Sequence, residues 1–254
     1  MPISPLPRHV QNRDASRTPD VRPRPKLTSE AECFVSSVLN RRPKTAVFDC
    51  DGTLWAGDAG EEFLRWEIKN NVISADVVEH ILPHYASYKQ GKIGEEEMCG
   101  EMVTLHEGLR VSEVEAAAER FFIELVERRI FPEMQELTRR LAEAGCELWA
   151  VSSTNEWVIR AGLRRFAIPQ ERVLAAAVEA EGGIVTARLI QVPTDEGKAR
   201  AIRKVISGSV DAVFGNSIHD EAMLALARYP YAVGPTAELR RVAEKRQWEV
   251  YCPQ

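Results

Sequence analysis

Short apolar runs alternate along most of the chain with segments whose apolar residues recur at helical spacing. The runs at residues 45–48, 147–151 and 211–214 are partly β-branched and show no polar alternation, which predicts buried parallel strands. Further strand-like runs occur at 173–178, 183–187, 231–233 and 248–251, with helical patterns between most of them. This order of elements predicts an α/β fold with a mainly parallel sheet.

Directly after the first strand-like run, only helical patterns occur, from Gly57 to about residue 130. Ser74 is placed as an N-cap before one of them, and Ser112 with Glu115 forms a capping box before another. The segment is too long for the single helix that usually connects two parallel strands. We therefore expect residues 57–130 to form an inserted all-helical cap, with residues 28–56 and 131–254 forming the core.

The beginning of the chain differs in composition from the rest. Residues 1–26 contain six prolines, five arginines and one lysine against two aspartates, and few residues that could enter a core. This composition predicts a disordered basic tail over residues 1–27.

The chain of 254 residues carries a net charge of −5, and no apolar run approaches the ~20 residues of a membrane span. We therefore expect neither a membrane span nor nucleic-acid binding. Five scattered cysteines without a CxxC pair favour reduced thiols and a cytoplasmic location. The sequence leaves the oligomeric state open.

Polar residues follow each of the three buried strands. Asp49 and Asp51 follow the first, Ser152 begins a cluster after the second, and residues 215–217 follow the third, with Asp220 shortly beyond. Because the carboxyl ends of parallel strands meet at one edge of a sheet, we expect these groups to converge. The paired acids then either lie beside a cation or are solvated turn residues, since buried charges are rarely left unpaired.

Together with Lys198, near the start of a later helix, these groups suit phosphoryl transfer through a carboxylate nucleophile. Asp49 would attack phosphorus, and Asp51 would protonate the leaving alkoxide and later deprotonate the attacking water. Ser152 and adjacent backbone N–H groups would hold a phosphoryl oxygen, while Lys198 would supply a fixed positive charge. A carboxylate attacking a dianion also needs charge neutralisation, which Mg²⁺ provides through oxygen ligands.

The sequence resembles the haloacid dehalogenase-like (HAD) superfamily in four motifs that occur in the family's order. They are Asp-Cys-Asp-Gly-Thr-Leu at residues 49–54, Ser152, Lys198, and Gly-Asn-Ser-Ile-His-Asp at residues 215–220. The helical segment resembles the C1 cap of the phosphoserine-phosphatase-like branch. The resemblance implies a Rossmann-like three-layer core, Mg²⁺ and an aspartyl-phosphate intermediate at Asp49. Asp51 is the residue that marks phosphatases in this superfamily, so we expect a Mg²⁺-dependent phosphomonoester hydrolase.

The last motif departs from the family pattern, because Asn216 stands where the family usually has a metal-binding aspartate. The resemblance then implies Asp49, Asp51, Asn216 and Asp220 as the Mg²⁺ ligands, with Asp220 carrying more of the electrostatic load. An amide oxygen can ligate Mg²⁺ but brings no charge. We therefore expect weaker Mg²⁺ binding than the family norm.

Substrate contacts are expected from the cap, where phosphoserine phosphatases use a glutamate for the substrate amine and an arginine for its carboxylate. Asp58, Glu61 and Glu62 lie near the first position, although acids there also suit the first turn of a helix. Met102 stands where we place the arginine. We expect a small phosphorylated metabolite as substrate, with its phosphate near Gly52, Thr53 and Ser153, and a phosphorylated amino alcohol stays open as one such metabolite.

The sequence leaves three other functions open. The chain could be L-phosphoserine phosphatase proper, or a phosphotransferase that passes the aspartyl-phosphate to a second alcohol. The third is a non-catalytic phosphate-binding module, for which Asn216 is the hint. The presence of Asp49, Asp51 and Lys198 speaks against that third function.

Overall fold

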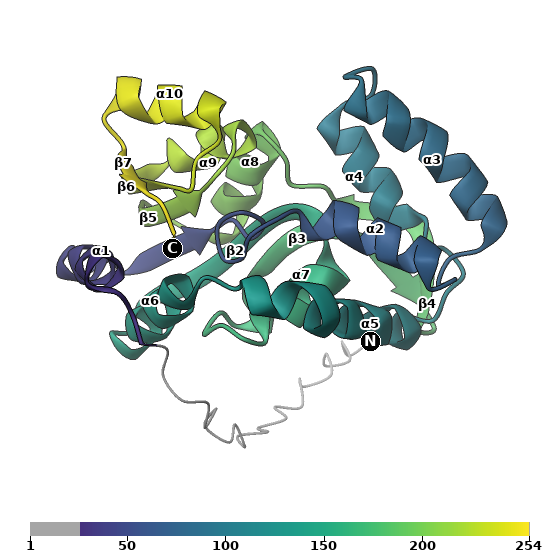
Figure 1. Ribbon diagram of the computed structural model, residues 1–254, viewed down its shortest axis with the longest axis horizontal. Helices are drawn as coiled ribbons and strands as arrows, with labels where there is room; N and C mark the ends of the chain where they lie inside the picture. The colour runs from purple at the N-terminus through teal and green to yellow at the C-terminus, as the bar shows by residue number, and fades with distance from the viewer. Residues whose placement is uncertain (1–25, 254) are drawn as a thin grey trace, which may run out of the picture.

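A seven-stranded sheet forms the centre of the molecule (Figure 1). The computed structural model describes residues 26–253. The strands lie in the order β4-β3-β2-β1-β5-β6-β7, and every neighbouring pair is parallel except β3 and β4. The expected α/β fold with a mainly parallel sheet is confirmed. The strands are Thr45–Phe48 (β1), Glu147–Asn155 (β2), Val173–Glu181 (β3), Ile184–Gln191 (β4), Val210–Gly215 (β5), Ala227–Val233 (β6) and Glu249–Tyr251 (β7).

Strand β1 lies in the middle of the sheet, between β2 and β5. Val47 is in register with Trp149 of β2 and with Val213 of β5. Successive residues of β1 enter opposite cores, because Ala46 and Phe48 pack on one face of the sheet and Val47 packs on the other. Burial on both faces explains why the sequence of this strand is a continuous apolar run.

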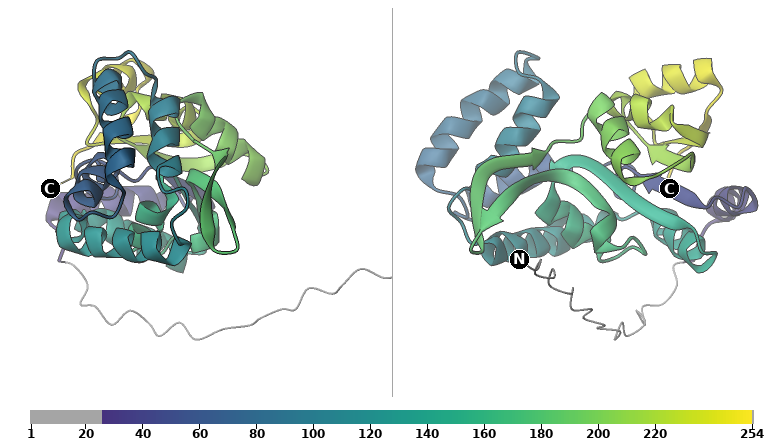
Figure 2. Two further views of the ribbon diagram at one scale, coloured as in Figure 1. Left: turned by 90° about the vertical axis from the view of Figure 1, so that its right-hand side faces the viewer. Right: turned by 180° about the vertical axis from the view of Figure 1, so that it is seen from behind.

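Helices cover both faces of the sheet, which gives the expected three layers (Figure 2). One face packs against α1 (Ser29–Asn40), α6 (Pro132–Glu143) and α7 (Glu156–Leu163), and the other against α8 (Glu196–Val205), α9 (Glu221–Leu224) and α10 (Ala237–Arg246). Among residues 26–253, no helix is long and apolar enough to cross a membrane.

Side-chain caps begin both α3 and α7, and the cap at Ser74 lies where the sequence predicts it. Ser74 Oγ accepts a hydrogen bond from the N–H of Val77 at the start of α3 (Ala75–Lys89). Asn155 Oδ1 accepts one from the N–H of Val158 at the start of α7. These local contacts satisfy backbone groups that a helix start leaves without a partner, so the sequence signal was sufficient there.

The start of α5 (Val111–Phe121) differs from the prediction. Ser112 and Glu115 lie inside the helix, and Arg110 at the N-cap position makes no side-chain cap bond. Instead, the N–H of Val111 donates to the carbonyl oxygen of Gly183, in the turn between β3 and β4, at 3.0 Å. The predicted capping box is therefore wrong, because a tertiary contact supplies the partner that a local cap would have given.

The sequence after residues 215–217 predicts a helix from about Asp220 to Arg228, and the observed helix is shorter. It ends at Leu224, and β6 begins at Ala227, which lies in register with Val210 of β5. Pairing with the sheet therefore overrides the helical pattern at the end of this segment.

The helical insert between β1 and α6 divides into two parts with different cores. Phe63 of α2 (Ala59–Lys69) and Phe121 of α5 belong to a main core beneath the sheet. By contrast, Ile81 of α3 and Met98 of α4 (Glu95–Thr104) form a small separate core. We call α3, α4 and their connection the lid hairpin (residues 75–104); it projects from the rest of the molecule in Figure 1.

A π-helical turn, η1 (Phe122–Val126), and a short 3-10 turn, η2 (Glu127–Arg129), lead from α5 back to the core. The cap boundaries at residues 57 and 130 stay a prediction. The expected tail lies outside the described residues up to residue 25, and Leu27 packs against the main core.

Candidate active site

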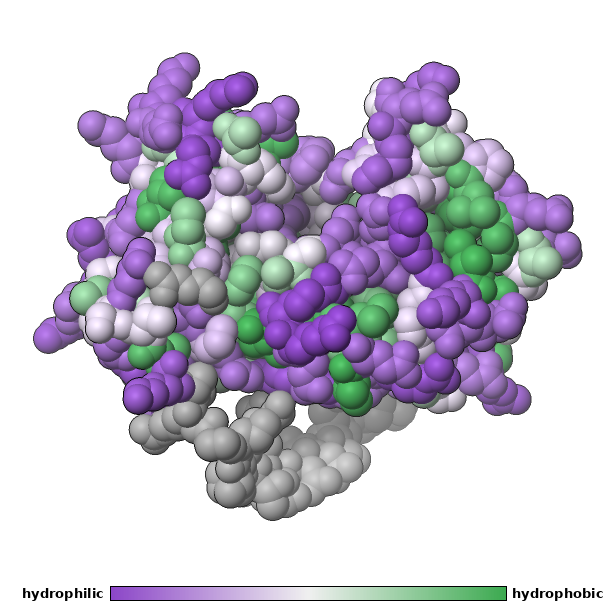
Figure 3. Space-filling view, viewed as in Figure 1, coloured by the Kyte–Doolittle hydropathy of each residue, from purple (hydrophilic) through white to green (hydrophobic). Residues whose placement is uncertain are grey.

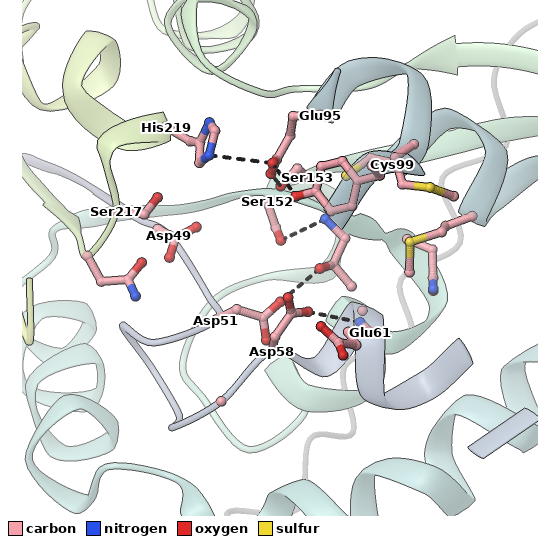
Figure 4. Close-up of a pocket in the computed structure, with 18 of the residues that line it drawn as sticks. Asp49, Asp51, Asp58, Glu61, Glu95, Cys99, Ser152, Ser153, Ser217 and His219 are labelled. Carbon is pink, nitrogen blue, oxygen red and sulfur yellow. Dashed lines mark hydrogen bonds and ion pairs between the residues drawn. The ribbon is translucent and has the colours of Figure 1, made fainter. Parts of the chain in front are cut away.

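A cavity of about 240 Å³ lies at the carboxyl edge of the sheet, beside the lid hairpin. Figure 3 shows the molecule hollowed between the lid hairpin and the helices α8 to α10, and Figure 4 shows side chains that line the cavity. Strands β1, β2 and β5 all end here, as expected for ligand sites in open α/β sheets. The lining residues at or just after these strand ends include Asp49, Asp51, Ser152, Ser153, Asn216 and Ser217.

The ammonium group of Lys198 joins two buried carboxylates, Asp49 at the floor of this cavity and Asp220 behind it. Lys198 Nζ donates to Asp49 Oδ1 at 2.8 Å and to Asp220 Oδ1 at 2.6 Å, and each of the three side chains is at most 6% exposed. Thr53 Oγ1 donates to the other oxygen of Asp49, Oδ2, at 2.9 Å. The structure thus brings together three predicted residues from the end of β1, the first turn of α8 and the segment after β5.

Burial and the neighbouring charges together set the pKa values of Asp49 and Lys198. Burial and the negative charge of Asp220 raise the pKa of Asp49 to about 7, although Lys198 partly offsets them. Burial alone would lower the pKa of Lys198, but Asp220 and Asp49 more than offset it and raise that pKa. Lys198 therefore stays charged, and a further cation beside Asp49 would favour the ionised carboxylate.

Asp51 lies in a different environment, held by three donors. Its Oδ1 accepts from Trp55 Nε1 at 2.7 Å and from the N–H of Ala59 at 2.8 Å, and its Oδ2 accepts from Thr154 Oγ1 at 2.8 Å. Burial, followed by the charge of Asp58, raises the pKa of Asp51 to about 6, which the hydrogen bonds partly offset. A carboxyl group with a pKa near neutrality suits proton transfer in both directions.

Asp220 does not line the cavity, although we expected it to bind the metal there. Its Oδ1 accepts from Lys198, and its Oδ2 accepts from the N–H groups of Asn216 at 2.9 Å and Ser217 at 3.0 Å. The side chain is fully buried. This geometry favours a role in positioning Lys198 and the turn after β5.

Asn216 packs directly against the first motif. Gly52 has a φ of +73°, and a Cβ atom at that residue would lie 1.8 Å from Asn216 Nδ2. Glycine is therefore required both by the backbone conformation and by the space that the amide occupies. Asn216 and Asp49 thus approach the cavity from two neighbouring strands.

The oxygen donors of Asp49 and Asn216 fit a hard cation such as Mg²⁺. Within residues 26–253, no group of three or more His, Cys, Asp or Glu side chains is arranged as a metal-binding cluster. Mg²⁺ does not need such a cluster, because it commonly takes one or two carboxylates and completes its shell with waters and phosphate oxygens. The carboxylates of Asp51 and Asp220 each accept three or more hydrogen bonds from the protein, against two at Asp49, which leaves them less capacity for a metal ion.

Ser152 and Ser153 are both at the cavity but differ in their contacts. Ser152 is 2% exposed, and its Oγ accepts from the N–H of Thr154 at 3.2 Å. Its own O–H is therefore available for a ligand oxygen, since a hydroxyl can accept and donate together. Ser153 Oγ instead donates to Glu95 Oε1 of the lid hairpin at 3.4 Å.

The three acids expected near the substrate occupy different places. Asp58 is the N-cap of α2 and lines the cavity. Glu61 also lines it and is bound by Lys89 Nζ at 3.0 Å. Glu62 does not line the cavity, because Arg129 holds its carboxylate through two hydrogen bonds of 2.7 and 2.5 Å. The position of Glu62 therefore does not favour a contact with substrate.

Thr154, Trp55 and Glu95 contribute to the site without having been predicted. Thr154 and Trp55 hold Asp51, and Glu95 reaches the cavity from the start of α4. Thr154 follows two predicted serines at the end of β2, so its place could have been inferred. Nothing in the sequence distinguishes Glu95, which faces the cavity, from its neighbours Glu96 and Glu97, which are exposed.

The chain belongs to the haloacid dehalogenase-like hydrolase family, whose model matches residues 46–225. The matched segment contains all four motifs, from Asp49 to Asp220. The phosphoserine phosphatase SerB1 of Mycobacterium tuberculosis is 28% identical over 217 residues, covering 81% of this chain and 69% of that protein. The histidinol-phosphatase of Neisseria meningitidis serogroup C is 26% identical over 220 residues, covering 81% of this chain and 96% of that protein.

Solved structures share the fold at lower identity. A protein of unknown function from Bordetella pertussis Tohama I has a TM-score of 0.71 and 21% identity, covering 82% of this chain and 97% of its own. A substrate-bound phosphoserine phosphatase has a TM-score of 0.56 and 18% identity, covering 83% of this chain and 92% of its own. The family resemblance inferred from the motifs is confirmed, and the chain is classed with the phosphatases of this family.

Replacing Thr154 by Val removes one of the three donors that hold Asp51. We expect kcat for p-nitrophenyl phosphate with Mg²⁺ to fall about 10-fold, the effect of one hydrogen bond to a charged group. The hydrogen bond from Thr154 lowers the pKa of Asp51, so its loss should also move the corresponding limb of the pH–rate profile to higher pH. Thr154→Ser keeps the hydroxyl and should keep most of the activity. Equal losses in both variants, or an unmoved profile in Thr154→Val, would contradict this positioning role.

Proposed function

We propose that the protein is a Mg²⁺-dependent phosphomonoester hydrolase that works through an aspartyl-phosphate at Asp49. The observation that carries the proposal is the buried contact of Asp49 with Lys198 at the floor of the cavity. Asp49 is also held by Thr53, so its carboxylate has little freedom to turn away from a bound ester. A nucleophile fixed in this way loses little further entropy when it reacts.

In the first half-reaction, an Asp49 oxygen forms a bond to phosphorus as the bond from phosphorus to the ester oxygen breaks. Asp51 gives its proton to the leaving alkoxide, and a pKa of about 6 leaves part of this group protonated near neutral pH. Lys198 and the O–H of Ser152 stabilise charge on the phosphoryl oxygens.

In the second half-reaction, water attacks the phosphorus of the aspartyl-phosphate. Asp51, now ionised, takes a proton from that water, and the bond between phosphorus and Asp49 breaks. Inorganic phosphate leaves, and both carboxyl groups return to their starting states. One carboxyl group thus acts first as an acid and then as a base.

Asp49 and Asn216 are the side chains that we propose to hold Mg²⁺. When bound, the ion supplies charge neutralisation for the attack of a carboxylate on a phosphate dianion. Asp220, which faces Lys198, would act through that lysine. This arrangement replaces the four-ligand set expected from the resemblance.

A small phosphorylated metabolite suits the cavity and the relatives. The cavity volume of about 240 Å³ leaves room for a small ester. The two relatives are named as a phosphoserine phosphatase and a histidinol-phosphatase, and phosphoserine and the phosphate ester of histidinol are both small phosphomonoesters. Closure of the predicted cap over such a substrate would exclude bulk water during the first half-reaction. The five cysteines are all free, which supports the proposed cytoplasmic location.

Asp49→Asn removes the proposed nucleophile but keeps its size and its contact with Lys198. We expect turnover of p-nitrophenyl phosphate with Mg²⁺ to fall by roughly 10³-fold or more. Asp211→Asn is a matched control, because Asp211 lies at the opposite end of β5 and accepts from the N–H of Lys44. The proposal fails if Asp49→Asn keeps wild-type turnover, or if the wild type hydrolyses no phosphomonoester.

Asn216→Asp restores the charge that the family usually carries at the metal. We expect the Mg²⁺ concentration at half-maximal rate to fall by about 10-fold, because a second carboxylate strengthens binding of a hard cation. The measurement is the rate of p-nitrophenyl phosphate hydrolysis against Mg²⁺ concentration. Asn216→Ala should require more Mg²⁺ than the wild type. An unchanged Mg²⁺ dependence in both variants would exclude Asn216 as a ligand.

A further inference from the structure

The cavity has a phosphate end and a leaving-group end with different chemistry. Asp49, Ser152 and Lys198 form the phosphate end at the strand ends. The lid hairpin and the start of α2 form the leaving-group end. Side chains there include Asp58, Tyr85, Tyr88, Glu95, Met98 and Met102. Figure 4 shows Glu95 descending from α4 on one side of the cavity and Asp58 on the other.

Glu95 is held over the cavity by donors from three parts of the chain. Tyr88 OH donates to Glu95 Oε2 at 2.7 Å, and Ser153 Oγ donates to Oε1 at 3.4 Å. His219 Nε2 lies 3.4 Å from Oε2, while His219 Nδ1 lies 2.8 Å from Asp195 Oδ1, so two acids share this ring. Among the described residues, no lysine or arginine forms an ion pair with Glu95.

Asp58, across the cavity, also lacks a lysine or arginine ion pair within residues 26–253. Burial raises the pKa of Asp58, and the negative charges of Glu61 and Glu95 add to this effect, while the N–H of Glu61 and the charge of Lys89 partly offset it. Glu61 is different, because Arg65 and Lys89 both pair with it. Two carboxylates on opposite sides of the leaving-group end therefore lack a full cationic partner.

The same end of the cavity has no lysine or arginine among the described lining residues to pair with an anionic substituent, and its histidine, His219, already faces Glu95 and Asp195. Lys198 is the single lysine or arginine that lines the cavity in the described part of the chain, and Asp49 and Asp220 already bind it. Met98 and Met102 supply apolar surface on the lid side. A substrate carboxylate there would meet like charge, and such juxtaposition is a strong means of rejecting a ligand.

We infer that the substrate is the phosphate ester of a cationic amino alcohol without a free carboxylate, and that Glu95 is a specificity-determining residue for its ammonium group. The inference rests on the proposed phosphatase function and specifies its substrate class. An ammonium group can donate to Glu95 and Asp58 together, while the methionines pack against the carbon chain. Phosphoserine carries the ammonium group but also the carboxylate that this end repels.

Three esters separate these features in the full-length protein with Mg²⁺. O-Phosphoethanolamine carries the ammonium group, n-propyl phosphate replaces it by a methyl group of similar size, and O-phospho-L-serine adds a carboxylate. We expect kcat/KM for O-phosphoethanolamine to exceed each of the other two by about 10-fold or more, equivalent to about 1.4 kcal/mol. p-Nitrophenyl phosphate serves as the general phosphatase probe.

Glu95→Gln removes the charge and keeps the shape of the side chain. It should lower the ratio of kcat/KM for O-phosphoethanolamine to that for n-propyl phosphate by about 10-fold. Glu97→Gln on the exposed face of the same helix is the matched control and should leave this ratio unchanged. A merely structural role for Glu95 would lower both values together and leave their ratio intact.

Equal kcat/KM for the three esters in the wild type would overturn the inference, as would a ratio that Glu95→Gln does not change. Both outcomes leave the phosphatase proposal standing, because turnover itself is observed. Absence of turnover of all four esters would instead overturn the phosphatase proposal and this inference with it.

Discussion

The contact of Lys198 with Asp49 and Asp220 is the constraint on which the rest of the site depends. An isolated buried charge costs several kcal/mol, so these three groups are tolerable only together. Because they come from the end of β1, the start of α8 and the segment after β5, their contacts fix three parts of the chain at one edge of the sheet. They also leave a net negative charge beside the cavity, which a divalent cation would offset.

The strand ends could be predicted, because buried parallel strands appear in the sequence as continuous apolar runs. Asp49 and Ser152 follow such runs, and their meeting at one edge is a consequence of parallel pairing. Lys198 could be suggested only by its place near a helix start and by the order of the family's motifs, since a lone lysine has no signature of its own. Asp220 shows a further limit: spacing placed it near the cavity, but two backbone N–H groups of its own turn direct its carboxylate elsewhere.

Contacts between elements distant in sequence account for most of what could not be predicted. The start of α5 depends on a carbonyl group in the β3–β4 turn, and the place of Glu95 depends on Tyr88 and Ser153. A helical pattern shows which face is apolar but not which polar residue meets another element. The residues of the proposed phosphate chemistry therefore lie on the core, whereas Glu95, which we propose to select the substrate, lies on the lid hairpin, whose contacts cannot be inferred from the sequence.

The most direct test of the central claim is to trap the phosphoryl group on Asp49. The protein would be mixed with p-nitrophenyl phosphate and Mg²⁺, quenched in acid during turnover and reduced with borohydride, which converts an aspartyl-phosphate to homoserine. Peptide mapping by mass spectrometry then locates the change. We expect homoserine in place of Asp49 and an unmodified Asp51. Reduction at another residue, or phosphate release with no reducible intermediate, would contradict it.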